Sequence, residues 1–197
     1  MSSQSQLSRA GFILAGGKSS RMGVDKAFLE FEGRTLLDRA IALLSEICDE
    51  VAIVGDPAKF ASHGTVVSDL YPGCGPLAGI HAALLHSNAD LNLIMAVDMP
   101  FVPADLVEFL FVTATESDAI VVVPRTAGGS QPLCAVYRRA FAAIAEAALK
   151  SGKYKIDALF SGTAARTVEE DELASAGFSE SMFFNLNTPD DLRSAKP

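Results

Sequence analysis

The chain has 197 residues, of which 49% are hydrophobic and 20% are charged, and its formal net charge at pH 7 is -8. This length and mixture predict a globular protein with a substantial core. The acidic balance lacks the basic footprint of proteins that bind nucleic acid, so an anionic ligand would need a locally positive site. The three cysteines are far apart and odd in number, which argues against a disulfide framework and a CxxC zinc site.

The ends of the chain and its apolar runs bear on where the protein resides. No run approaches the roughly 18 apolar residues of a membrane span. The first ten residues, MSSQSQLSRA, are polar and lack the apolar centre of a signal peptide. We therefore expect a cytoplasmic protein that binds no membrane, with reduced thiols, a disordered lead over residues 1–10 and a single domain over residues 11–197.

Predicted strands and helices alternate along the chain, judged from apolar periodicity and from turn and capping residues. In chain order they are a strand over 12–15, a helix over 35–48, strands over 51–54 and 65–69, a helix over 80–85, a strand over 91–97, a helix over 103–111, strands over 119–124 and 132–137, helices over 139–150 and 154–160, a strand over 182–187 and a helix from 188. The alternation predicts an α/β fold with a mostly parallel sheet. The less regular later strands predict an antiparallel member, and hence a mixed sheet.

A glycine-rich segment, LAGGKSSRMGVDK, follows the first predicted strand. It is not a P-loop, because that motif requires a glycine where the chain has Phe12. It is not a dinucleotide fingerprint either, because Gly16 and Gly17 are adjacent. Adjacent glycines admit a base or sugar close to the main chain, and Arg21 and Lys26 are suited to phosphate oxygens. The alternative for this segment alone is an ordinary turn with solvated cations.

Two aspartates follow predicted strands. Asp98 ends the apolar run over 91–97, at the edge where open α/β sheets bind ligands, and a carboxylate there is suited to Mg²⁺. Asp69 precedes a loop with three glycines, YPGCGPLAG. Each aspartate taken alone is equally typical of a turn or a helix cap.

Five segments in order, LAGGKSSRMGVDK, DLYPGCGPLAGI, VDMPF, QPLCAVYRR and FFNLNTPDDL, resemble the MobA family of molybdenum cofactor guanylyltransferases. The resemblance covers nearly the whole chain. It implies a Rossmann-like, three-layer α/β/α nucleotidyltransferase fold. It also implies that GTP and Mo-molybdopterin are the substrates and that the products are the guanine dinucleotide cofactor and diphosphate.

The resemblance further implies roles for individual residues. Main-chain contacts to the nucleotide fall to Leu14, Ala15, Gly16 and Gly17. Arg21 and Lys26 would face the triphosphate, and Asp69 would contact the guanosine part. Asp98 would bind Mg²⁺ and through it the phosphates, so that Arg21, Lys26 and Asp98 form the catalytic set. Asn185 and Asn187 would line the molybdopterin side.

One departure from the family pattern concerns the end of the second main strand. The family often has an asparagine there that helps to hold the nucleotide, whereas this chain reads VAIVGDP. Either that contact is lost or Asp56 makes it. The related cytidylyltransferases tend to read LAAG where this chain reads LAGG, and Gly17 leaves room for a purine, which favours GTP.

The second substrate is large and anionic, and the sequence offers two kinds of site for it. One is a set of C-terminal cations, for which a solvated face is the more common explanation. They are Arg125, Arg138, Arg139, Lys150, Lys153 and Lys155. The other is the segment TAGGS, residues 126–130, as a mobile substrate loop. The family inference also gives a recipient molybdoenzyme as a partner and leaves open whether an accessory protein assists.

Other functions remain as alternatives at this point. A molybdopterin cytidylyltransferase or a sugar-phosphate nucleotidyltransferase would share the fold. A non-catalytic nucleotide-binding regulator is a further alternative, although it would not need Lys26 and Asp98 together.

Overall fold

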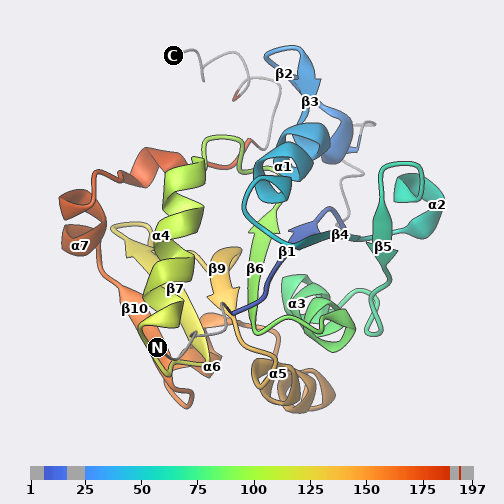
Figure 1. Cartoon of the computed structure of the whole chain (residues 1–197). Coiled ribbons are helices and arrows are strands. Elements are labelled where there is room, and N and C mark those ends of the chain that lie inside the picture. The colour runs from blue at the N-terminus through green and yellow to red at the C-terminus, as the bar shows by residue number, and fades with distance from the viewer. Residues whose placement is uncertain (1–6, 17–24, 187–190, 192–197) are drawn as a thin grey trace, which may run out of the picture.

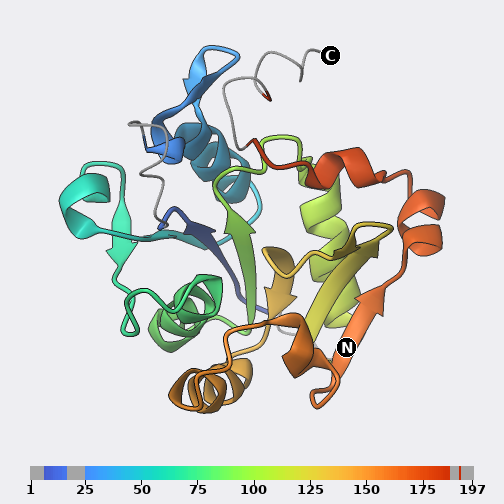
Figure 2. The same cartoon turned by 180° about the vertical axis from the view of Figure 1, so that it is seen from behind.

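The computed structural model describes residues 7–16, 25–186 and 191. Within these residues the centre of the molecule is a mixed eight-stranded sheet in the order β10-β7-β9-β6-β1-β4-β5, with β8 paired to β7. Its strands are β1 (Arg9–Leu14), β4 (Glu50–Val54), β5 (Thr65–Val67), β6 (Leu91–Ala96), β7 (Val121–Thr126), β8 (Gly129–Ser130), β9 (Cys134–Tyr137) and β10 (Ala165–Val168). A separate hairpin of β2 (Glu30–Phe31) and β3 (Arg34–Thr35) projects from one end of the molecule (Figures 1 and 2).

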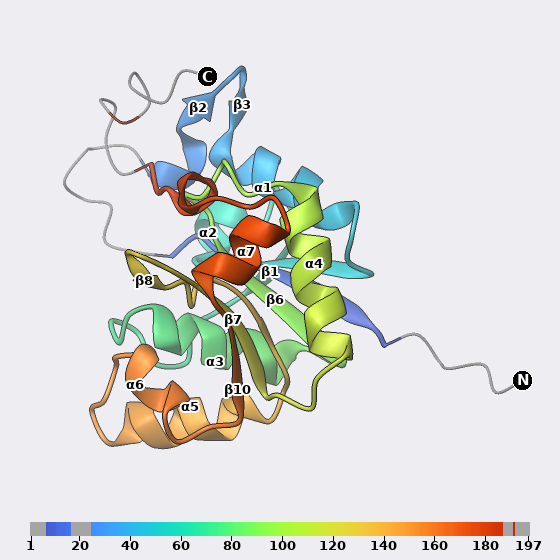
Figure 3. The same cartoon turned by 90° about the vertical axis from the view of Figure 1, so that its left-hand side faces the viewer.

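Helices cover both faces of the sheet, which confirms the three-layer arrangement. The helices are α1 (Leu36–Ser45), α2 (Pro57–Phe60), α3 (Pro76–His86), α4 (Ala104–Thr115), α5 (Phe141–Lys150), α6 (Asp157–Phe160) and α7 (Glu170–Ser175), with 3-10 turns η1 (Lys26–Phe28) and η2 (Glu180–Phe183). In Figure 3, α1, α4 and α7 lie above the sheet, and α3, α5 and α6 lie below it. Two apolar clusters fill the two spaces between the layers.

Side-chain alternation along the strands assigns each residue to one cluster. In β1, Ile13 belongs to the cluster under α1 and α4, whereas Phe12 and Leu14 belong to the cluster over α3 and α5. The six residues of β6 are all buried, as a central strand covered on both faces requires. The pairs β1–β4, β1–β6, β4–β5 and β7–β10 are parallel, and β9 is antiparallel to both β6 and β7. This confirms the predicted mixed sheet.

Thr35 and Asp38 form a variant of the capping box at the start of α1. The Thr35 hydroxyl oxygen accepts a hydrogen bond from the Asp38 main-chain N–H at 3.0 Å, as an N-cap should. The Asp38 carboxylate, however, accepts a hydrogen bond from the Thr35 hydroxyl at 2.7 Å. The shorter aspartate thus bonds the side chain of the cap, where the glutamate of a full capping box reaches the main-chain N–H.

Two expectations about the chain ends are corrected. β1 begins at Arg9, so Arg9 and Ala10 belong to the sheet and not to the polar lead. The strand expected over 182–187 is wrong for the described part of that segment, where η2 is followed by irregular chain. The physical reason is that the Leu186 N–H donates to the Asp98 carbonyl oxygen at 2.8 Å, a loop contact instead of a strand ladder. The helix expected from residue 188 lies outside the described residues, apart from helical Asp191.

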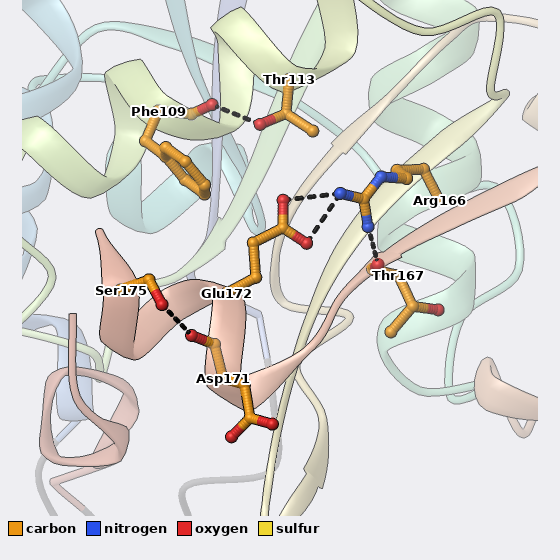
Figure 4. A network of polar contacts seen from close by, with 7 residues as sticks. All are labelled: Phe109, Thr113, Arg166, Thr167, Asp171, Glu172 and Ser175. Atoms are coloured by element: carbon orange, nitrogen blue, oxygen red, sulfur yellow. Dashed lines mark hydrogen bonds and ion pairs between the residues drawn. The ribbon is translucent and has the colours of Figure 1, made fainter. Parts of the chain in front are cut away.

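Two elements were not predicted from the sequence: β10, which extends the sheet beyond β7, and α7, which follows it. Figure 4 shows how the two elements are joined: the Arg166 guanidinium of β10 donates to both oxygens of Glu172 in α7, at 2.6 and 2.7 Å. The same guanidinium donates to the Thr167 carbonyl oxygen. Both bonds come from one nitrogen, Nη2, so the pair is a charge-assisted tie between β10 and α7 at the edge of the sheet.

No helix in the described part of the chain is both long enough and apolar enough to cross a membrane.

Candidate functional site

The candidate site lies where the order of the strands reverses. β1 is flanked by β4 on one side and β6 on the other, and the chain leaves the carboxyl ends of these strands in different directions. A crevice at this point is the usual ligand site of open α/β sheets. Here it is a cavity of about 640 Å³. Its described lining residues are Leu14, Ala15, Gly16, Lys26, Val54, Gly55, Asp69, Gly73, Gly75, Pro76, Gly79, Ala96, Val97, Asp98 and Leu133.

An ion pair stands in this cavity. Lys26 Nζ lies 3.0 Å from Asp98 Oδ2, and both side chains are mostly buried, with 26% and 18% of their surfaces exposed. Asp98 follows β6 directly, and Lys26 is the first residue of η1. The sequence analysis placed both residues in the catalytic set, and the structure brings them together across 72 positions of the chain. A fixed cation beside a carboxylate gives the acidic protein a local site for phosphate.

Asp25 holds η1 in place beneath Lys26. Its carboxylate caps the turn by accepting from the Ala27 N–H at 3.3 Å. It also accepts from Lys59 Nζ in α2 at 2.7 Å. This hydrogen bond to Asp25 is the main cause that raises the pKa of Lys59 above its ordinary value. Asp25 therefore orients Lys26 and links it to the element that follows β4.

Asp69 reaches the opposite wall of the cavity. Its Oδ1 accepts from the Tyr71 N–H at 2.7 Å, which forms an Asx-turn and opens the glycine-rich loop. Gly73 and Gly75 both have positive φ, at 82° and 74°, a conformation that side chains rarely adopt. Pro76 then begins α3. The wall is therefore made of main chain, and it admits a ligand closely.

Packing explains two of the three other glycines that line the cavity. A Cβ on Gly79 would lie 3.1 Å from Leu14 Cδ2, so α3 approaches β1 closely there. A Cβ on Gly55 would lie 2.8 Å from the Phe60 ring. At Gly16, by contrast, the nearest atom to such a Cβ is the Val54 carbonyl oxygen at 3.8 Å. Such a Cβ would make only ordinary van der Waals contacts, so packing does not require a glycine at this lining position.

Two main-chain groups at the end of β1 are hydrogen-bonded to neighbouring strands of the sheet or to the residue that follows one. The Ala15 N–H donates to the Val54 carbonyl oxygen at 3.0 Å, and the Leu14 carbonyl oxygen accepts from the Val97 N–H at 3.2 Å. Both residues line the cavity as expected, but these two groups already have partners. A ligand would meet Leu14 and Ala15 through their other atoms.

The remaining predicted residues divide into three groups. Gly17, Arg21 and Asn187 lie outside the described residues. Asn185 is exposed and directly precedes Leu186, whose N–H is bonded to the Asp98 carbonyl oxygen. Asp56 uses Oδ1 to cap α2 through the Ala58 N–H, and Gly55 takes its place among the described lining residues.

Several lining residues were not assigned to the site from the sequence: Val54, Gly55, Gly73, Gly75, Pro76, Gly79, Ala96, Val97 and Leu133. Val54, Gly55, Ala96 and Val97 lie at the carboxyl end of a parallel strand or directly after one. Strand ends could therefore have indicated them. Pro76 and Gly79 of α3, and Leu133 before the antiparallel β9, required knowledge of how the elements pack.

The donor chemistry of the cavity fits Mg²⁺ bound together with a nucleotide. The described residues contain no group of three or more acidic, histidine or cysteine side chains able to enclose a metal. Mg²⁺ in nucleotide sites usually takes one or two carboxylates, with phosphate oxygens and water completing its shell. Asp98 supplies one such carboxylate, of which Oδ2 is shared with Lys26.

The three histidines and two of the C-terminal cations, Arg138 and Lys150, do not belong to the described lining of the cavity. His81 is 1% exposed, and its burial lowers its pKa. None of His63, His81 and His86 is among the described lining residues. Arg138 donates to three main-chain carbonyl oxygens at 2.9 to 3.0 Å. Lys150 pairs with Glu146 at 2.8 Å. These groups stabilise the fold.

Comparisons with known proteins agree with this architecture. The family model described as "MobA-like NTP transferase domain" matches residues 11–167. The molybdenum cofactor guanylyltransferase of Desulfosudis oleivorans is 34% identical over 94% of this chain and 93% of its own. A probable molybdenum cofactor guanylyltransferase of Pelotomaculum thermopropionicum is 37% identical over 96% and 93%.

A solved structure is similar over the same extent. Molybdopterin-guanine dinucleotide biosynthesis protein A from Archaeoglobus fulgidus superposes with a TM-score of 0.81 at 28% identity, covering 94% of this chain and 96% of that one. The 2-C-methyl-D-erythritol 4-phosphate cytidylyltransferase of Thermus thermophilus, at 20% identity and a TM-score of 0.67, shares the fold. The α/β nucleotidyltransferase fold, the cavity at its switch point and the matches along nearly the whole sequence lead to one conclusion: the chain belongs to the MobA-like NTP transferase family.

Proposed function

We propose that this protein transfers GMP from GTP to Mo-molybdopterin, with Mg²⁺, in the biosynthesis of the molybdenum cofactor. The observation that carries the proposal is the Lys26–Asp98 pair, 3.0 Å apart in a cavity of about 640 Å³ at the switch point of the sheet. That volume is within the ordinary range for small-molecule sites. The names of relatives that align over nearly the whole chain support the choice of substrates.

The reaction is a displacement at the α-phosphorus of GTP. A terminal phosphate oxygen of molybdopterin forms the new P–O bond, and the bond to the β-phosphate oxygen breaks, so diphosphate leaves with the electron pair. The attacking phosphate is already anionic near neutral pH, so the reaction needs no strong general base. This agrees with the absence of histidine from the described cavity lining.

The residues of the chain contribute position and charge. Lys26 holds phosphate oxygens and offsets charge that moves onto the leaving diphosphate. Asp98 would hold Mg²⁺, which supplies Lewis-acid charge stabilisation on the phosphates when bound. The main-chain wall from Asp69 to Pro76 confines the nucleoside, and Gly16, which lines the cavity without a side chain, lets it approach the main chain. Arg21 is proposed as a second phosphate ligand.

Guanine is the base favoured for this site. The sequence LAGG at residues 14–17 and the guanylyltransferase names of the relatives both support GTP. The cytidylyltransferase neighbour at 20% identity supports the fold alone. The proposed setting is the cytoplasm, with a molybdoenzyme as the final recipient of the product.

Product analysis tests the proposal. Purified protein is incubated with Mo-molybdopterin, GTP and Mg²⁺, and the mixture is analysed by mass spectrometry for the guanine dinucleotide. We expect the product to form and to disappear when EDTA removes the metal. A protein that binds GTP tightly but forms no product under these conditions would contradict the enzymatic function.

A further inference from the structure

The turn between β7 and β8 stands at the same edge of the sheet as the nucleotide cavity. Both β6 and β7 are antiparallel to β9, so they run in the same direction and end at the same edge. The described cavity lining comes almost wholly from β6, β1, β4 and the connections that follow them and β5, with only Leu133 from the β9 side. The β7–β8 turn therefore stands outside the described lining of the nucleotide cavity, on the side of Asp98 toward β9 and β7.

Glu180 fastens this turn. Its Oε1 accepts from the Thr126 hydroxyl at 3.0 Å and from the Gly128 N–H at 2.8 Å. The Gln131 amide nitrogen donates to the Thr126 hydroxyl oxygen and to the Gly129 carbonyl oxygen, each at 3.4 Å. The Thr126 hydroxyl thus donates its proton to Glu180 and accepts a hydrogen bond from Gln131. In this structure the turn within the predicted substrate loop over residues 126–130 is therefore held by side-chain hydrogen bonds from Glu180 and Gln131.

The segment that carries Glu180 is also tied to the catalytic set. We call residues 180–186 the C-terminal strap; it contains η2, exposed Phe184 and Asn185, and buried Leu186. At one end Glu180 holds the β7–β8 turn, and at the other the Leu186 N–H donates to the Asp98 carbonyl oxygen at 2.8 Å. Figures 2 and 3 show the strap lying alongside the turn.

We propose that Glu180 is a positioning residue for the acceptor substrate, the phosphate-bearing pterin. Its carboxylate joins the β7–β8 turn and the strap into one wall beside Asp98. That wall carries Asn185 and the Gln131 amide, whose nitrogen donates to Thr126 and Gly129, and amide groups of this kind suit the N–H donors and ring acceptors of a pterin. This inference rests on the proposed function and adds a residue to its acceptor side.

Gly128 provides an independent test of the same contact. A Cβ at Gly128 would lie 2.9 Å from Glu180 Oε1, too close for the carboxylate to keep its place. The next atom is the Thr126 hydroxyl oxygen at 3.6 Å, an ordinary contact. Gly128→Ala should therefore raise KM for molybdopterin in the parent. The same change should raise it little further in a protein that already carries Glu180→Ala.

The experiment measures KM for molybdopterin and for GTP separately. Glu180→Ala should raise KM for molybdopterin about tenfold, in the range expected for lost hydrogen bonds to a charged group, and leave KM for GTP within about twofold. Glu180→Gln keeps an oxygen that accepts both bonds and should stay within about threefold of the parent. Glu169→Ala is the control, because Glu169 pairs loosely with Arg125 at 3.6 Å and does not contact the turn.

Hydrogen exchange at the Gly128 amide reports the hydrogen bond between Gly128 and Glu180 without any substrate. It should accelerate in Glu180→Ala and not in Glu169→Ala. An active parent in which Glu180→Ala leaves KM for molybdopterin unchanged, or raises both KM values equally, would overturn the inference alone. A parent that forms no guanine dinucleotide would overturn the proposed function and the acceptor role together.

Discussion

The Lys26–Asp98 pair predicts that loss of either charge and loss of both will have similar effects on turnover. The two groups are 3.0 Å apart in a mostly buried cavity, and each keeps the other in position. Replacing either one by an uncharged residue, in Lys26→Met or Asp98→Asn, should slow transfer on the order of 10²–10³, by analogy with the loss of one transition-state donor. The double variant should be about as slow as the slower single variant.

The magnitude for folding is much smaller. Two unit charges at 3.0 Å attract by about 5 kcal/mol at an effective dielectric constant of about 20, and by about 1.4 kcal/mol in water. Desolvation and partial exposure offset most of that attraction, so the net effect on the free energy of unfolding should be about 1 kcal/mol or less. Large catalytic losses should therefore occur in variants that remain folded.

The assay pairs single-turnover diphosphate release with urea unfolding of the same four proteins. Independent action of the two residues would multiply their effects, giving a double variant slowed on the order of 10⁴–10⁶. That result would refute the reasoning that the pair acts as a unit. A loss of several kcal/mol in unfolding free energy would instead show that the pair is mainly structural.

Three other substitutions test separate parts of the structure. Gly16→Leu adds a side chain at a position that lines the cavity and where a Cβ meets no close contact, so KM for GTP should rise at least about tenfold with little change in melting temperature; unfolding of the variant would contradict this. Arg138→Met leaves three main-chain carbonyl oxygens without their donor and should lower the urea unfolding free energy by about 2–4 kcal/mol, whereas a change below about 0.5 kcal/mol would show that water replaces it. Burial lowers the pKa of His81, so the unfolded chain binds its proton more tightly, and parent stability should fall as pH drops below 6.5 toward the folded pKa. His81→Leu should reduce that fall between pH 7 and pH 5, although Glu146, Asp69 and Lys150 still face the position; an equal fall in both proteins would contradict it.

Much of the fold was predictable because its strands are short apolar runs followed by turn residues. β6 is buried along its whole length and β1 is nearly so, and both were located to within two or three residues at their ends. β10 and α7 were not predictable in this way. In β10 only Val168 is fully buried, and the contact that joins it to α7 is a pair of charged residues, Arg166 and Glu172. Charged residues of this kind carry no strand periodicity.

The site was predictable where chemistry follows directly from a strand end. Asp98 and Asp69 occupy such positions, and both line the cavity. The role of Glu180 could not be predicted, because it depends on a turn 52 residues earlier in the chain. The strand expected near residues 182–187 failed for a related reason: the Leu186 N–H bonds to a loop carbonyl that the local sequence does not indicate.

The most direct test of the central claim is diphosphate release with Mo-molybdopterin and Mg²⁺, with GTP and CTP supplied in parallel to the parent and to Asp98→Ala. The account predicts release with GTP, little with CTP, and a loss on the order of 10²–10³ in the variant. Release with CTP alone would overturn the choice of base. Equal release by the parent and Asp98→Ala would contradict the assignment of the Lys26–Asp98 cavity as the catalytic site.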